Sequence, residues 1–129
     1  MVLIGGSVAK LKNKNPAEKI LDPDLHFRAL KVLQENPELS QRELAKIIGV
    51  SLGSINYCLK ALVAKGQIKI NNFKRNTDKT VYLYLLTPSG ISEKARLTSG
   101  FLKRKLIEYD LLKREIDALQ SIRQKSIRK

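Results

Sequence analysis

Between Ser51 and Lys60 the sequence places small and polar side chains at the spacing of successive turns of one helix. The side-chain amide of Asn56 offers one hydrogen-bond acceptor beside one donor, which complements the edge that adenine exposes in the major groove of DNA. Tyr57 and Lys60 can reach a base or a phosphate, and Gly53 allows a phosphate to approach the backbone near the helix start. These types predict a DNA-contacting face made of Ser51, Gly53, Ser54, Asn56, Tyr57 and Lys60.

An ordinary solvated surface is the alternative for such a face. Helices that are merely exposed usually mix Glu with Lys, whereas this one begins with small residues and continues with an Asn-Tyr pair and one lysine. We therefore favour contact with nucleic acid over simple solvation.

A second group of cations lies in residues 71–80, a segment too polar to pack in a core. Apolar and polar residues alternate on both sides of it, which predicts two strands joined by a projecting turn over this segment. A basic turn beside a DNA-binding helix can follow the phosphates or insert an arginine into a narrow minor groove. The cations concerned are Lys74, Arg75 and Lys79.

Two short helices around a glycine turn are expected to position the polar face. Ser40 and Glu43 have the spacing of a capping box at the start of the first helix, and Gly49 can leave that helix in a left-handed conformation. Ser51 then caps the second helix, over residues 52–65. The expected apolar faces comprise Leu44, Ile47 and Ile48 on the first helix, and Ile55, Leu59, Leu62 and Val63 on the second.

A further helix is predicted before this pair, from Asp22 as its cap and Pro23 as its first residue to Asn36. Residues 1–20 show no sustained period, and we expect them to form a flexible arm. The pattern is typical of a mainly α fold with a small β-hairpin, a winged helix-turn-helix over residues 21–87.

One long helix is predicted after this domain, because Thr87-Pro88 provides a start and no proline follows up to Lys129. We expect some weakening at Ser99-Gly100. An apolar seam at heptad spacing needs a partner helix, so residues 88–129 are expected to form a dimerisation helix with a basic tail. The seam consists of Leu102, Tyr109, Leu112, Ile116 and Leu119. The additional apolar residues Leu106, Leu111 and Ile122 leave open packing against the domain or against an N-terminal segment of the partner.

The charge balance indicates a polyanionic partner. The 129 residues carry a net charge of +13, which favours nucleic acid or an acidic membrane surface as partner. Residues 1–66 contain ten Lys and Arg against six acids, and residues 67–129 contain fifteen against six. The excess therefore belongs to the hairpin and the C-terminal helix.

Several classes of protein are disfavoured by what the sequence contains. Cys58 is the single cysteine, which excludes an intrachain disulfide, and with one histidine it does not supply a structural zinc site. We expect Cys58 to be semi-buried and His26 to lie at a boundary. No paired catalytic groups or glycine-rich phosphate loop occur, so we expect no enzyme, metal or cofactor. The apolar opening Met1–Ala9 is too short for a membrane anchor, and a cytoplasmic protein is expected.

A family resemblance accompanies these patterns. The sequence resembles the MarR-type winged-helix regulators, and among them the small bacterial subgroup of exopolysaccharide-associated transcriptional regulators, over about residues 23–120. The resemblance implies a homodimeric DNA-binding repressor or activator, a recognition helix at 52–65, a wing at 71–80 and a role at exopolysaccharide genes. It identifies no operator and no small-molecule effector. The segments that carry it are 36–45, 49–62, 82–90 and 93–98.

Two other functions stay open at this point. A winged helix can serve as a protein-interaction module, which an acidic or apolar recognition face would favour. A basic coiled coil can also bind RNA or acidic lipid without sequence preference. Aromatic residues exposed on the sheet would support RNA, and Tyr82 and Tyr84 are the only candidates.

Overall fold

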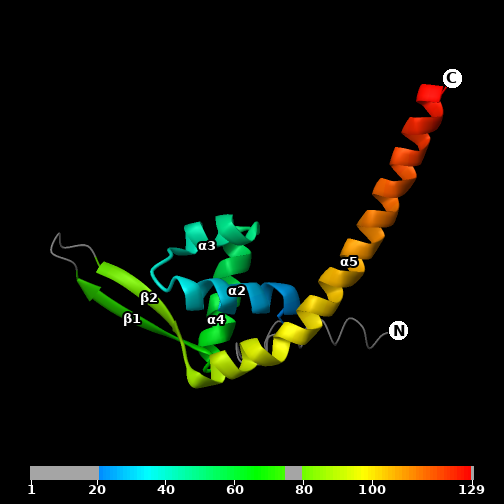
Figure 1. Ribbon diagram of the computed structural model, residues 1–129. Coiled ribbons are helices and arrows are strands. Elements are labelled where there is room, and N and C mark those ends of the chain that lie inside the picture. Colours follow the sequence, from blue (N-terminus) through cyan, green and yellow to red (C-terminus); the bar gives the residue numbers. More distant parts are fainter. Residues whose placement is uncertain (1–20, 75–79, 129) are drawn as a thin grey trace, which may run out of the picture.

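The computed structural model describes residues 21–74 and 80–128 of the chain. Three helices and a two-stranded antiparallel sheet form a small domain, and one long helix leaves it (Figure 1). This arrangement confirms the predicted mainly α winged helix-turn-helix with a small hairpin and a long C-terminal helix. The elements are α2 (Pro23–Glu35), α3 (Gln41–Ile48), α4 (Leu52–Ala64), β1 (Ile68–Lys74), β2 (Thr80–Leu86) and α5 (Pro88–Arg128).

The helix starts follow the predicted capping residues. The carboxylate of Asp22 accepts a hydrogen bond from the backbone at the start of α2. At α3 the Ser40 hydroxyl accepts from the Glu43 N–H at 3.1 Å, and the Glu43 carboxylate accepts from the Ser40 N–H at 3.1 Å. The Ser40 backbone N–H that donates to the carboxylate, together with the Ser40 side chain, holds the pKa of Glu43 below its ordinary value. Gly49 then leaves α3 with φ of 85°, as predicted.

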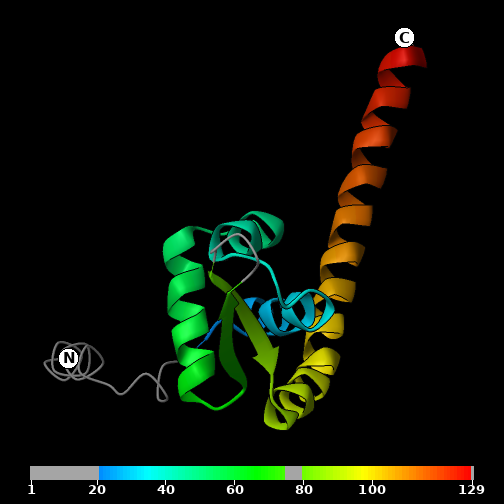
Figure 2. The same cartoon turned by 90° about the vertical axis from the view of Figure 1, so that its left-hand side faces the viewer.

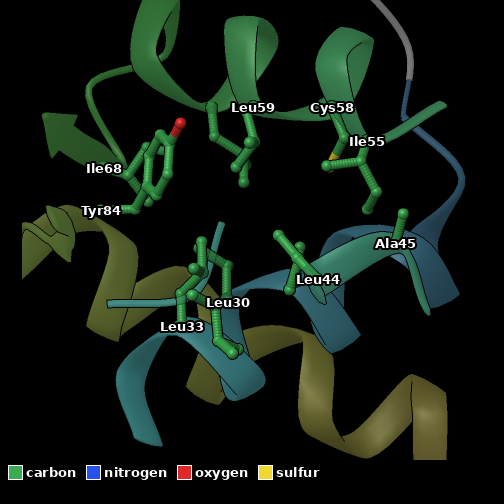
Figure 3. Packing of buried hydrophobic residues seen from close by; sticks show 12 residues of the cluster. Leu30, Leu33, Leu44, Ala45, Ile55, Cys58, Leu59, Ile68 and Tyr84 are labelled. Carbon is green, nitrogen blue, oxygen red and sulfur yellow. The ribbon is translucent and has the colours of Figure 1, made fainter. Parts of the chain in front are cut away.

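The core lies where α2, α3 and α4 meet the base of the sheet. Figure 3 shows side chains from α4 above those from α2 and α3, with Ile68 and Tyr84 at one side. Leu30, Leu44 and Ile55 are completely buried. One side of each helix therefore meets this cluster, as the apolar periodicity predicted.

Three predicted positions on these helices are wrong. Ile47 and Val63 are 58% and 40% exposed, because the buried faces are centred on Leu44 and Ala45 in α3 and on Leu59 in α4. Cys58 is completely buried rather than semi-buried, and burial raises the pKa of its thiol to about 11.

The hairpin is longer than predicted. Its strands pair from Ile68 with Leu86 to Lys74 with Thr80, so the predicted turn over 71–80 is too long at both ends. The arm over residues 1–20, Arg75 and Lys79 lie outside the described residues. Directly paired residues of an antiparallel sheet point to the same face. The face that packs on the core at the Ile68–Leu86 pair therefore continues along the hairpin, beyond the part that the helices cover.

Tyr84 belongs to this core side and is buried, so of the two candidate sheet aromatics only Tyr82 is exposed. The Tyr84 side chain is 7% exposed, whereas Ile70, its direct cross-strand partner, is 48% exposed. Tyr82 lies farther from the core and is 52% exposed. Tyr82 is more exposed than Tyr84 because the helices cover only the base of the hairpin.

The helix α5 begins at the predicted cap and runs unbroken through Ser99 and Gly100. The Thr87 hydroxyl accepts from the Gly90 N–H at 3.1 Å. Figures 1 and 2 show the helix bending in its yellow part and then extending away from the domain. Its 41 residues correspond to about 60 Å of helix.

The first third of α5 is held against α2. The rings of Phe27 and Phe101 stack with their centroids 4.5 Å apart. The Arg104 guanidinium donates to the Asp24 carboxylate at 2.6 Å. Beyond this contact, side chains on every face of α5 are exposed, so most of the helix lies outside the domain core.

Candidate nucleic-acid interface

The second helix of the helix-turn-helix, α4, stands at the side of the domain opposite α5 (Figure 2). Its buried face is formed by Ile55, Leu59 and Leu62. The opposite face is thereby turned away from the domain core. Because α4 contains no acidic residue, this face carries no carboxylate of its own. Its first turn has the positive end of the helix dipole, and Lys60 supplies a positive charge farther along the helix.

The structure brings most of the predicted contact residues together on this face. Gly53, Ser54 and Lys60 are exposed, and Tyr57 is 40% exposed. Ser51 is also exposed, at the start of the helix. A hollow of about 320 Å³ adjoins the same end of α4 and is lined by Leu21, Asp22, Leu25, Gly53, Ser54 and Tyr57.

The two serines at the start of α4 have structural bonds as well. The Ser51 hydroxyl accepts from the Ser54 N–H at 3.1 Å, which confirms Ser51 as the cap. It also donates to the Ser54 hydroxyl at 2.9 Å. The pair therefore orders the first turn of α4, where the backbone N–H groups point outward from the helix.

Asn56 differs from its neighbours because it is partly buried and bonded to another helix. Its side-chain Nδ2 donates to Oε1 of Gln41, the first residue of α3, at 3.3 Å. The Gln41 Nε2 in turn donates to the Tyr84 hydroxyl at 3.4 Å. The sequence analysis did not include Gln41 among the contact residues. The only sign of its role in the sequence was its position at the start of α3.

The predicted wing residues are only partly within the described chain. Lys74 is the last residue of β1 and pairs with Thr80. The base of the hairpin is joined to α4, since Gln67 donates its N–H to the carbonyl of Leu62 at 2.9 Å. The hairpin therefore starts directly at the end of α4.

A buried junction connects the end of α4 with α2 and α5. His26 is 9% exposed, so its prediction as a boundary residue is wrong, and its Nε2 lies 2.6 Å from Oε1 of Gln67. The Thr87 hydroxyl donates to the Gly66 carbonyl at 2.5 Å. At Gly90 a β-carbon would lie 2.0 Å from the Gln67 carbonyl oxygen. Only a glycine lets α5 begin this close to the strand.

A second hollow, of about 410 Å³, lies between α2, α3 and α5. Phe27, Val32 and Phe101 are among its apolar residues, and Arg28 and Lys31 are among its cations. The exposed Ile47 also lines it.

The comparisons with known proteins agree with this geometry. Residues 23–69 match the sequence model of a family described as winged helix-turn-helix DNA-binding. The zinc-dependent MarR family transcriptional regulator AdcR, in its Zn(II)-bound crystal structure, is 20% identical with a TM-score of 0.50, over 86% of this chain and 77% of that chain. The adhesin competence repressor AdcR from Streptococcus pyogenes is 18% identical with a TM-score of 0.54, over 93% of this chain and 86% of that chain.

The chain has a MarR-type winged-helix fold. The sequence resemblance to MarR-type regulators predicted this fold, and these similarities confirm it. No curated protein matches the sequence.

Neither a metal cluster nor a single spanning helix is found in residues 21–74 and 80–128 of this winged-helix chain. No three His, Cys, Asp or Glu side chains there are grouped to hold a metal ion. No single helix there is long and apolar enough to cross a membrane, although α3 and α4 reach that criterion as a pair bent by 109°.

Proposed function

We propose that this protein is a sequence-specific DNA-binding transcriptional regulator that acts as a homodimer in the cytoplasm. The outward face of α4 carries the proposal, because it combines a helix N-terminus, small residues and Lys60 without any carboxylate. The net charge of +13 supports the same partner. The match of residues 23–69 to a DNA-binding family and the likeness to AdcR add further support.

In the proposed complex α4 lies in the major groove and the hairpin lies along the flanking backbone or minor groove. The backbone and hydroxyl groups at the start of α4 bind phosphate, and the amide of Asn56 reads a base edge. The contacting residues are Ser51, Gly53, Ser54, Asn56, Tyr57 and Lys60 on α4, with Lys74, Arg75 and Lys79 on the wing.

The proposed dimer forms along α5. Its five seam residues are between 44% and 60% exposed, which leaves a long apolar stripe for a second copy to cover. Two copies present two α4 helices, so the operator is expected to be a palindrome with half-sites set by the dimer. Exopolysaccharide genes are the proposed targets on the sequence resemblance alone. The proposal includes no effector and no catalytic activity.

The test begins with selection of bound duplexes from a random pool, which is expected to yield a palindrome. Replacing Asn56 with alanine is then expected to cost about 1–3 kcal/mol on the selected duplex and little on a scrambled one. The double change Lys74→Ala with Lys79→Ala is expected to weaken both duplexes alike, and to reduce the salt slope by about one unit for each phosphate that is no longer neutralised. Replacing Arg75 with alanine is expected to lower the affinity by an amount that depends on the A·T content of the duplex.

Titrations of each variant against both duplexes at two salt concentrations separate reading of bases from binding of phosphates. An equal loss on both duplexes for Asn56→Ala would show that α4 does not read sequence. That result would favour the protein-interaction module, as would a random pool that yields no preferred duplex.

A further inference from the structure

We infer that Gln41 is a positioning residue that turns the amide of Asn56 so that it selects a base with an exocyclic amino group, adenine above all. The inference rests on the proposed function and names the base that Asn56 reads in it. It starts from the chain of hydrogen bonds Tyr84–Gln41–Asn56, which links the sheet, α3 and α4.

The first link of this chain is firmly held. The ring of Tyr84 lies in the core, 7% exposed, and its backbone N–H donates to the Pro37 carbonyl at 3.0 Å. Figure 3 shows its hydroxyl oxygen directed toward the α4 side of the core, where Leu59 lies. Gln41 directly follows the Ser40 cap of α3, so both the backbone of Gln41 and its hydroxyl partner have fixed positions.

The second link determines which atom of Asn56 faces outward. Because Nε2 of Gln41 donates to Tyr84, its Oε1 is the atom left for Asn56, and it accepts from Nδ2 at 3.3 Å. The oxygen and the nitrogen of a side-chain amide point in different directions from their shared carbon. When Nδ2 donates to Gln41, Oδ1 is therefore not engaged in this contact. Oδ1 is an acceptor with two lone pairs, and Nδ2 retains a second N–H.

This presentation distinguishes the bases in the major groove. Adenine and cytosine present amino groups, whereas guanine and thymine present carbonyl oxygens at the corresponding positions. An outward Oδ1 accepts from an amino group and repels a carbonyl oxygen. The remaining N–H of Nδ2 can donate to N7, which adenine has and cytosine lacks at this edge. Adenine therefore uses both groups.

The experiment changes the hydrogen-bonding character of residue 41. It then measures base preference at the operator position where Asn56→Ala abolishes that preference. Gln41→Glu supplies only acceptors, so it is expected to keep Nδ2 inward and to retain the adenine preference. Gln41→Lys supplies only donors, so it is expected to draw Oδ1 inward and to shift preference toward guanine. Gln41→Met has no polar group and is expected to lower the adenine preference about two- to tenfold.

Base preference is a ratio of affinities, and a charge change at residue 41 that alters phosphate binding acts on all duplexes alike. Tyr84→Phe removes the hydroxyl and leaves the buried ring, so it is expected to lower the same preference within the same range. Gln34→Met is the matched control, since Gln34 is an exposed glutamine of α2 that bonds to Lys94. Thermal unfolding of each variant verifies that it is folded.

The possible failures are distinct. If Asn56→Ala abolishes an adenine preference that Gln41→Met leaves at its original value, the inference is refuted and the proposed function stands. The same holds if Gln41→Glu and Gln41→Lys prefer the same base. If the unmodified protein selects no duplex at all, the proposed function fails, and the inference fails with it.

Discussion

Replacing Leu112 and Ile116 with aspartate on α5 is expected to convert the proposed dimer into monomers. The two side chains are 55% and 44% exposed in the single chain. Full burial of such a side chain contributes about 1.5–3 kcal/mol, so covering the exposed half contributes about 1 kcal/mol. Both residues occur in each protomer, which gives about 4 kcal/mol for the dimer, or about a thousandfold in Kd.

The aspartates add to this loss, because a carboxylate buried in an apolar seam has no partner there. A dimer with a micromolar Kd is therefore expected to have a Kd of about millimolar or above after the change, so the variant is expected to be monomeric at micromolar concentration. Sedimentation of the protein at micromolar concentration measures this directly. A matched control is Ser121→Asp with Gln124→Asp, which adds the same two negative charges to exposed positions of α5 outside the seam.

A monomeric unmodified protein at micromolar concentration would refute the reasoning, since the seam would then be exposed without a partner. A double aspartate variant that sediments as a dimer would refute it as well. In that case another surface would hold the two copies together.

Two further predictions concern stability. Gly90→Ala is expected to lower the free energy of unfolding by about 1–3 kcal/mol in urea, because its β-carbon would lie 2.0 Å from a backbone oxygen. Gly53→Ala is the control and is expected to have no such cost, since its nearest neighbour would be 3.9 Å away; a similar loss in both would contradict the steric cause. Burial raises the pKa of the Cys58 thiol from 9.0 to about 11, so the unfolded chain loses its proton first and stability is expected to fall as pH rises through this window. The decline should be smaller in Cys58→Ala, measured by urea unfolding at several pH values, and an identical decline would show that other groups cause it.

Local patterns of the sequence determined the helix boundaries. The capping box of Ser40 and Glu43, the left-handed turn at Gly49 and the cap at Thr87 all form as predicted. In each case the atoms that bond are separated by only a few residues, so the pattern of residue types already contains both partners. The same is true of the alternating periods that distinguish the strands from the helices.

The predicted DNA-binding face depended on helical periodicity, which places Gly53, Tyr57 and Lys60 opposite Ile55 and Leu59. The structure has these side chains on the exposed and buried faces respectively. Periodicity gives the angle of each side chain about its own helix, but it does not give the width of the face that neighbouring elements cover.

Only the tertiary structure decided how wide the buried faces are and which distant groups meet. Ile47 is exposed and Cys58 buried because α2, α3 and α4 cover particular sectors of one another. Gln41 meets a side chain 15 residues away and another 43 residues away. The sequence by itself therefore determined the elements and the polar face of α4. The contact that orients Asn56 depends on how α3 and α4 cross and where the sheet begins, and these positions follow from packing of the whole core.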